Sequence, residues 1–392
     1  MNETLPLAPV RDMARPVHMF WLSAPYGLYT AAVVGGCLSF LMRREGIPLD
    51  KIAQYSAFLV IPSSIYFLWS PLVDLGVARR FWFLLSNLFT IALMVAGTLL
   101  LRQHLKFAIA LYFLGVCVCM LMSAACGGIM AEVFTPGSKL RAASWYQMGN
   151  LSIGSLGTGV LLWLATKVGI PLWAAIAAAL MLFPGLSALL LREPKREEFV
   201  GWSSHLQGLG REFRQTFLNR HNLVALLLLG GPAGAGAILS LLPAIAEDYH
   251  VRAVDLAWIN GPAGGLMLAL GAFVGGFLPS RVNIRFAYGA LGLLMGVASM
   301  FLWLGPATEA VYLAGFLTYT FLMGCGYVFY SALVLDVVGP AGCSGSTRYT
   351  LLNSLGNLPI AYMTWMEGLG ALHFGFRGFA MVESLGAMRI KP

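Results

Sequence analysis

The sequence predicts an all-α membrane protein built from two six-helix bundles related by pseudo-two-fold symmetry. Of the 392 residues, 58% are hydrophobic and only 11% are charged, and the mean hydropathy is +0.77. A soluble domain of this length does not have such a composition. The chain also repeats its polar residues and helix breakers after about 205 residues. These two observations together indicate a polytopic membrane protein with an internal duplication.

The repeat is carried by residues that membrane helices usually avoid. The matched positions are Pro25 and Pro232, Gly27 and Gly234, Asp50 and Asp255, Glu132 and Asp336, Pro136 and Pro340, and Arg141 and Arg348. All six offsets fall between 204 and 207 residues. Polar groups and helix breakers are costly in lipid, so their return in register favours two similar bundles, as in transporters.

The apolar windows are long enough to cross a bilayer, which takes about 20 residues per helix. We expect spans at residues 18–42, 52–73, 80–101, 107–133, 142–166, 171–191, 222–245, 254–278, 285–305, 309–336 and 345–370. The last segment, 374–392, contains four charged residues and predicts a short or incomplete twelfth helix.

These spans divide the chain into an N-terminal bundle (1–191), a linker (192–221) and a C-terminal bundle (222–392). In the linker, apolar residues recur every three or four positions and arginines stand between them. We expect an amphipathic helix on the cytoplasmic membrane surface. The apolar residues are Phe199, Trp202, Leu206, Leu209, Phe213 and Phe217.

The distribution of basic residues predicts the orientation. With the N-terminus inside, 17 of the 25 lysines and arginines fall in cytoplasmic segments. Such an excess is typical of cytoplasmic loops and predicts that both termini are cytoplasmic. It also explains the net charge of +8 without a nucleic-acid partner. The first 17 residues are polar and the first apolar segment has spanning length, so we expect no cleavable signal peptide.

The loop after the second predicted helix carries a recognisable motif. It reads Ser70-Pro71-Leu72-Val73-Asp74-Leu75-Gly76-Val77-Ala78-Arg79-Arg80. This resembles the Gly-x-Leu-x-Asp-Arg-x-Gly-Arg-Arg loop of the major facilitator superfamily, with the leucine, the aspartate and the closing arginine pair kept. It departs from that pattern at Ser70 and lacks the arginine after Asp74. The corresponding loop of the second half, residues 275–281, has no acidic residue.

Two shorter elements are similar to the muropeptide permease and acetyl-CoA transporter group of that superfamily. They are a Trp-x-Pro-x-x-Asp element at Trp69, Pro71 and Asp74, and a Pro-x-Gly at Pro25 and Gly27. The resemblance implies a proton-coupled importer of cell-wall fragments in the bacterial inner membrane. Siderophore importers with similar elements, and drug transporters, remain alternatives. We expect a monomer without cofactor or metal.

Charged residues at the predicted cytoplasmic ends are candidates for gating. Asp74 could pair with Arg79 or Arg80 or meet the positive end of another helix. Making and breaking that contact would shift the balance between inward-open and inward-closed states. The alternative is an interfacial aspartate in a tight turn. The repeat partners Glu132 and Asp336 are each followed by a proline and then an arginine. This suggests two matched latches, by which we mean salt bridges that open and close: Glu132 with Arg141, and Asp336 with Arg348.

Polar and aromatic side chains within the spans must be hidden from lipid, and this predicts a cavity between the bundles. The candidates for binding a sugar or a peptide are Tyr26, Tyr29, Gln147, Asn150, Tyr319, Tyr327, Tyr330, Asn353 and Asn357. For any single amide, hydrogen bonding between helices is the alternative.

Proton coupling requires a carboxyl group that can be buried and reached. The candidates are Glu132, Asp336 and Glu367, the last in a long apolar run. Motifs of metalloproteases, serine hydrolases and phosphate-binding loops are missing from the sequence, so we do not expect an enzyme. A sensor that kept the transporter fold without transport is the other alternative, because the last helix and the second loop motif are degraded.

Overall fold

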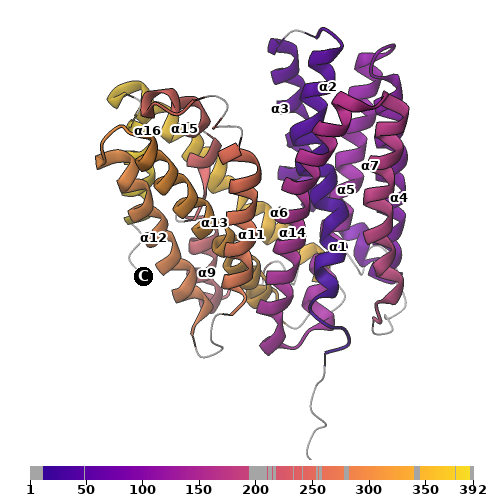
Figure 1. Cartoon of the computed structure of the whole chain (residues 1–392). Helices are drawn as coiled ribbons and strands as arrows, with labels where there is room; N and C mark the ends of the chain where they lie inside the picture. Colours follow the sequence, from indigo (N-terminus) through magenta and orange to yellow (C-terminus); the bar gives the residue numbers. More distant parts are fainter. Residues whose placement is uncertain are drawn as a thin grey trace, which may run out of the picture.

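The computed structural model describes residues 12–47, 49–193, 210, 214, 218–232, 234–240, 242–252, 255, 258–277, 282–339, 345–375 and 377–388. These residues form an almost entirely helical membrane protein of two bundles (Figure 1). Within them, seven helices are long and apolar enough to cross a membrane. The predicted linker helix falls largely outside the described residues.

The N-terminal bundle follows the predicted spans closely. Its elements are α1 (His18–Gly27), continued by a π-helix (Leu28–Cys37) and α2 (Leu38–Arg44), then α3 (Leu49–Ile65), α4 (Arg79–Leu100), α5 (Leu105–Val133), α6 (Pro136–Lys167) and α7 (Ile170–Gly185). After α3 the chain forms two 3-10 segments, Tyr66–Leu68 and Ser70–Asp74. We call the end at which α1 begins the basal end, at the bottom of Figure 1, and the opposite end the distal end.

The C-terminal bundle is more irregular. Its helices are α9 (Arg220–Leu229), α11 (Gly264–Gly275), α12 (Ile284–Leu304), α13 (Glu309–Val338), α14 (Gly345–Leu355), α15 (Asn357–Phe374) and α16 (Gly378–Met388). Short 3-10 segments lie at Ala237–Ser240, Leu242–Ile245 and Glu247–Tyr249, and a π-helical turn (Ile259–Ala263) precedes α11. The last helix is short, as the charged residues of its segment predicted.

The predicted continuous span 222–245 is wrong. α9 ends at Leu229, and Gly234 and Gly236 adopt left-handed φ values of 77° and 69°. A right-handed helix cannot continue through such angles, which glycine reaches without a steric cost. The run of glycines and Pro232 therefore unwinds this segment instead of only bending it.

The predicted span 345–370 is interrupted at Gly356, between α14 and α15. A Cβ at Gly356 would lie 1.9 Å from the Tyr330 hydroxyl, so only glycine lets this tyrosine approach. The break bends the chain beside the space between the bundles.

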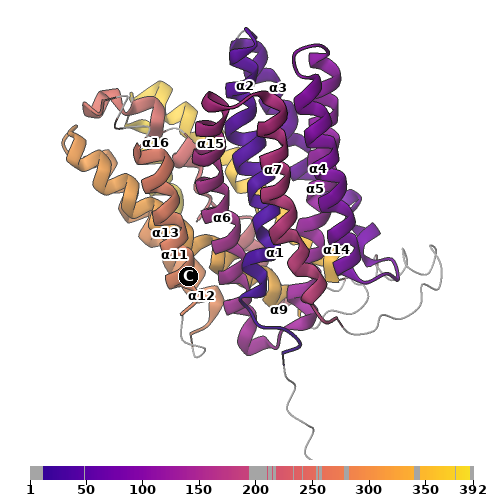
Figure 2. The same ribbon diagram turned by 45° about the vertical axis from the view of Figure 1, so that its right-hand side comes forward.

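The two bundles meet through a small set of helices. In both views α6 lies on the face of the N-terminal bundle nearest the C-terminal one (Figures 1 and 2). α6 packs on α11 and α13, and α14 packs on α5. The bundles are close at the basal end and diverge toward the distal end (Figure 1).

Candidate functional site

A cavity of about 150 Å³ lies between the bundles and is lined by residues of both. The N-terminal bundle contributes Tyr26, Ser123, Tyr146, Gln147 and Asn150. The C-terminal bundle contributes the rest of the wall, including Tyr288, Met323, Tyr327, Tyr330, Tyr349, Asn353 and Asn357. None of the described lining residues is charged. Six tyrosines and four side-chain amides therefore determine the chemistry of this space.

Close helix packing positions the amides of α6. A Cβ at Gly27 would lie 2.2 Å from the Asn150 carbonyl oxygen, and one at Gly149 would lie 2.1 Å from that of Phe20. Glycine at these two positions thus lets α1 and α6 touch along their backbones. The Gln147 amide crosses to the other bundle and donates to Ser331 Oγ at 2.7 Å, and Asn150 Nδ2 lies 3.4 Å from Gln147 Oε1.

The amides of the second half also reach across the interface. Asn353 Nδ2 donates to the Tyr66 hydroxyl at 2.8 Å, and Asn357 Nδ2 donates to the Ser63 carbonyl at 3.1 Å. Each amide has two N–H groups and a carbonyl oxygen, so one bond leaves it capacity for a solute.

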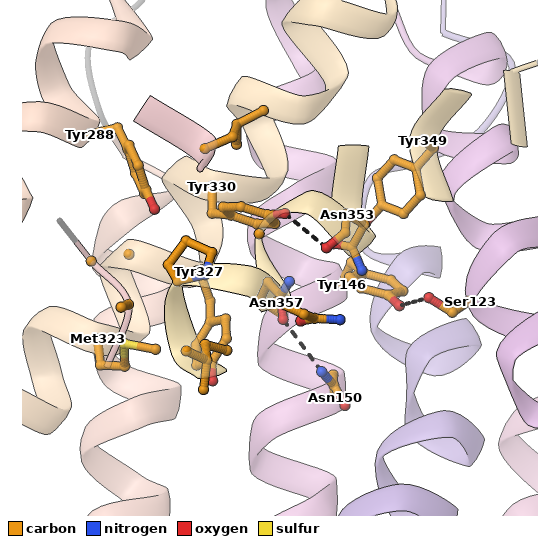
Figure 3. Close-up of a pocket in the computed structure, with 18 of the residues that line it drawn as sticks. Ser123, Tyr146, Asn150, Tyr288, Met323, Tyr327, Tyr330, Tyr349, Asn353 and Asn357 are labelled. Carbon is orange, nitrogen blue, oxygen red and sulfur yellow. Dashed lines mark hydrogen bonds between the residues drawn. The ribbon is translucent and has the colours of Figure 1, made fainter. Parts of the chain in front are cut away.

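The tyrosines surround the cavity from several helices, as Figure 3 shows. The Tyr330 hydroxyl donates to the carbonyls of Leu352 and Asn353 at 3.0 and 3.1 Å, which holds its ring against the helix break. The Tyr146 hydroxyl lies 3.3 Å from Ser123 Oγ. Rings held in this way present flat faces of fixed orientation to the cavity.

Of the nine side chains predicted for binding, seven line the cavity. One exception is Tyr29, which is fully buried within the N-terminal bundle and donates to the Tyr112 carbonyl at 3.0 Å. The described lining does not include Tyr319 either. The sequence did not identify Tyr146, Tyr288 and Tyr349, although Tyr146 adjoins Gln147 and Tyr349 lies one turn before Asn353.

A buried ionic cluster lies below the cavity, at the basal end. The Arg79 guanidinium donates to Asp74 Oδ1 at 3.0 Å and pairs with Glu132. The Asp74 and Arg79 side chains have no exposed surface, and that of Glu132 is 22% exposed. Arg79 also donates to the Gly128 carbonyl and to Ser346 Oγ, so its donors are well satisfied. Burying such a charge is costly without these partners.

Asp74 joins this cluster to the other bundle by binding the first turn of α14. Its Oδ1 accepts from the Ser346 backbone N–H at 3.2 Å. Its Oδ2 accepts from the backbone N–H and the hydroxyl of Thr347, both at 2.8 Å. A carboxylate is favoured there because the first N–H groups of a helix lack partners and carry the positive end of its dipole.

Two further contacts close the basal end. Ser70 Oγ lies 2.5 Å from Thr350 Oγ1, and Lys139 Nζ donates to the Gly339 carbonyl at 2.9 Å. Together with Asp74, they tie the 3-10 turn Ser70–Asp74 and the start of α6 to the end of α13 and the start of α14.

The remaining gating candidates lie elsewhere. Arg80 is exposed and donates to the Leu191 carbonyl, so Arg79 is the partner of Asp74. Arg141 is exposed, and Glu132 pairs with Arg79. Asp336, 46% exposed, pairs with Arg285 at 3.1 Å, and Arg348 donates to the Val337 carbonyl. Among the described residues, therefore, Glu132 with Arg141 and Asp336 with Arg348 do not form the matched pairs that the repeat predicted.

The acidic candidates for proton binding occupy three different environments. Glu132 belongs to the ionic cluster, Asp336 lies at the surface, and Glu367 is fully buried in α15. In the described residues no group of three or more histidine, cysteine, aspartate or glutamate side chains could hold a metal ion.

Comparisons with known proteins agree with this architecture. Residues 49–362 match the sequence profile of the Major Facilitator Superfamily. No curated protein matches the chain. Among solved structures, the human organic anion transporter MFSD10 superposes with a TM-score of 0.71 at 16% identity, covering 95% of this chain and 97% of that one.

Two other structures superpose over similar lengths. The transporter FucP in its outward conformation gives a TM-score of 0.68 at 13% identity, over 95% of each chain. The proton:xylose symporter XylE, bound to a bromodeoxyglucose, gives 0.67 at 11% identity, over 95% of this chain and 93% of that one. At these identities the likeness concerns the fold.

Proposed function

Since this chain belongs to the major facilitator superfamily, we propose that it is a secondary transporter that moves a small amphiphilic solute across the inner membrane by alternating access. The solute class that we propose is a muropeptide-like compound or another sugar-containing one, taken up with protons. The observation that carries this proposal is the uncharged cavity of tyrosines and amides.

The chemistry of the cavity favours the sugar part of such a solute. Hydroxyl groups exchange hydrogen bonds with amides and phenols, and the apolar face of a sugar ring packs on an aromatic ring. An ionised carboxylate would be desolvated here without a described cationic partner, which is unfavourable. The volume of about 150 Å³ is below the roughly 300–1,000 Å³ of pockets for drug-sized ligands, so it suits a group of about one ring.

The basal contacts support an outward-facing state for this conformation. The bundles are tied by Asp74, Ser70 and Lys139 at the basal end and diverge at the distal end (Figure 1). If the basal end faces the cytoplasm, as the basic residues predict, solute enters from the outside. Release inward then requires Asp74 to leave the first turn of α14.

Uptake into vesicles that contain the purified protein tests the function. The two probes are a labelled anhydromuropeptide and the same anhydro-disaccharide with a simple amide in place of its peptide, so that no ionised carboxylate is introduced. We expect accumulation of the disaccharide when a proton gradient is imposed. Folded protein that takes up neither probe would contradict the proposal and favour a siderophore, a drug or a sensor role.

Asn150→Ala should weaken solute binding, because Asn150 lines the cavity and its side-chain hydrogen bond is to Gln147 of its own helix. Losing one hydrogen bond of about 0.5–1.5 kcal/mol raises KM for the disaccharide about 2- to 12-fold. Gln103→Ala, which removes an exposed amide, is the matched control. An unchanged KM in Asn150→Ala would remove this residue from the binding site.

Asp74→Asn should shift the protein toward the inward-facing state. The amide is neutral, so it loses the ion pair with Arg79 and the attraction to the dipole of α14. We expect greater reactivity of a cysteine placed at Thr350 and a changed uptake rate. If both the reactivity and the uptake rate are unchanged, Asp74 does not gate.

A further inference from the structure

Two glutamates lie side by side inside the C-terminal bundle, away from the basal cluster. Glu367 of α15 has no exposed surface, and Glu383 of the short α16 is 1% exposed. Their carboxyl groups are close enough to hydrogen-bond to each other. Glu383 belongs to the segment whose charges made a twelfth helix difficult to predict.

The surroundings offer these carboxyl groups very little compensation. The Tyr319 hydroxyl of α13 donates to Glu383 Oε1. Both oxygens of Glu367 and the second oxygen of Glu383 accept no hydrogen bond from a described donor. No lysine or arginine of the described chain forms an ion pair with either residue. Tyr362 of α15 is another described titratable group near Glu383, and Tyr327 of α13 lies near Tyr319.

Elementary electrostatics determines the charge of this pair. Two carboxylates in contact repel each other, and each would be buried in apolar surroundings without a cation. A carboxylate cannot donate a hydrogen bond, so a bond between the two groups requires a proton on one of them. If the two groups share one proton, Glu367 forms a hydrogen bond to Glu383. The pair then carries one negative charge, which the hydroxyl of Tyr319 stabilises by donating to Glu383.

Helix α15, which carries Glu367, and helix α13, which carries Tyr319, both lead to the cavity. On α15, Pro359, Met363 and Glu367 are four residues apart, and Pro359 lines the cavity. On α13 the same spacing joins Tyr327 and Met323 of the cavity wall to Tyr319. Residues four apart lie on the same helix face, and eight residues rise roughly 12 Å, so Glu367 lies about two turns from the cavity along α15 and Tyr319 about one turn from it along α13.

The close approach of α15 and α16 depends on two glycines. A Cβ at Gly378 would lie 1.9 Å from the Gly370 carbonyl oxygen. α16 is then held on its other side by α12, where Ser384 Oγ lies 2.7 Å from Ser299 Oγ. The short last helix is therefore packed so that Glu383 faces Glu367.

We propose that Glu367 and Glu383 form one proton-binding site in which the two carboxyl groups share a proton, with Tyr319 as donor to Glu383. The proton is bound and released once per transport cycle. This second statement rests on the proposed function, because it assigns the coupling ion of the transporter to this pair.

Infrared spectroscopy of the purified protein tests the shared proton without any solute. We expect the C=O stretching band of a protonated carboxyl group at neutral pH, shifted in D2O. The band should disappear in the double variant Glu367→Gln, Glu383→Gln and persist in Glu247→Gln, an exposed glutamate far along the chain. If the double variant does not fold, each single variant should shift the band. Absence of the band, or a band unchanged in all these variants, overturns the site.

Transport in vesicles tests the coupling. With the labelled anhydro-disaccharide, Glu367→Gln and Glu383→Gln should each exchange internal for external solute at near wild-type rate. Both should lose accumulation above the external concentration under a proton gradient. Unchanged accumulation in both overturns the coupling. If the wild type neither exchanges nor accumulates this probe, the proposed solute is wrong, while the infrared result still decides the proton site.

Discussion

Arg79→Leu is expected to open the basal end and to lower the stability of the described conformation by about 3–5 kcal/mol, the usual effect of removing one partner from a buried ion pair. Asp74 and Glu132 would then lie close together without the guanidinium that separates them. Ser346 would also lose its donor. The state in which the bundles part at the basal end relieves this repulsion by admitting water.

Distances between spin labels measure this change. In a cysteine-free background, labels at the exposed positions Val77 and Val282 report the basal end, and labels at Gln103 and Ala310 report the distal end. We expect the first distance to increase and the second to decrease in Arg79→Leu. The neighbouring exposed Arg80→Leu is the matched control and should leave both distances as in the wild type. Identical distances in the two variants would show that the ionic cluster does not hold the basal end.

Gly271→Ala should destabilise the C-terminal bundle although alanine is the better helix former. A Cβ at Gly271 would lie 2.0 Å from the Phe321 carbonyl oxygen, and one at Gly324 would lie 2.2 Å from that of Leu268. Backbone atoms cannot yield as a flexible side chain can, so α11 and α13 must separate. Overpacking of this kind costs about 1–3 kcal/mol. Thermal unfolding in detergent should show a lower midpoint.

Gly159→Ala is the control with the opposite expected sign. This glycine of α6 is exposed, and a Cβ would meet nothing within 4 Å. The substitution should therefore raise stability by roughly 0.5–1 kcal/mol through helix propensity alone. A Gly271→Ala protein as stable as Gly159→Ala would contradict the close packing of α11 on α13.

The cavity was largely predictable because of a rule that acts on each residue separately. An amide in a membrane helix must be hidden from lipid, and Gln147, Asn150, Asn353 and Asn357 are all found between the bundles. The rule could not predict the position of Tyr29. A buried phenol can also donate its hydrogen bond to a backbone carbonyl within its own bundle, and Tyr29 donates to that of Tyr112.

The partners of the charged residues were less predictable. Arg79 and Arg80 are neighbours in the sequence, and only the start of α4 determines which of them turns inward to Asp74. In the same way, the repeat of Glu132 and Asp336 predicted matched latches. The structure instead pairs Glu132 with Arg79 of its own bundle and Asp336 with Arg285.

By itself, the sequence determined that this is a duplicated helical membrane protein, because lipid excludes unpaired polar groups and leaves a regular hydropathy pattern along the chain. It also located the four amides of the cavity and three of its six tyrosines. Only the tertiary structure decided where helices break, which arginine meets Asp74, and that Glu383 of the short last helix lies against Glu367. These features depend on distances between segments remote in the sequence, and neither composition nor periodicity contains such distances.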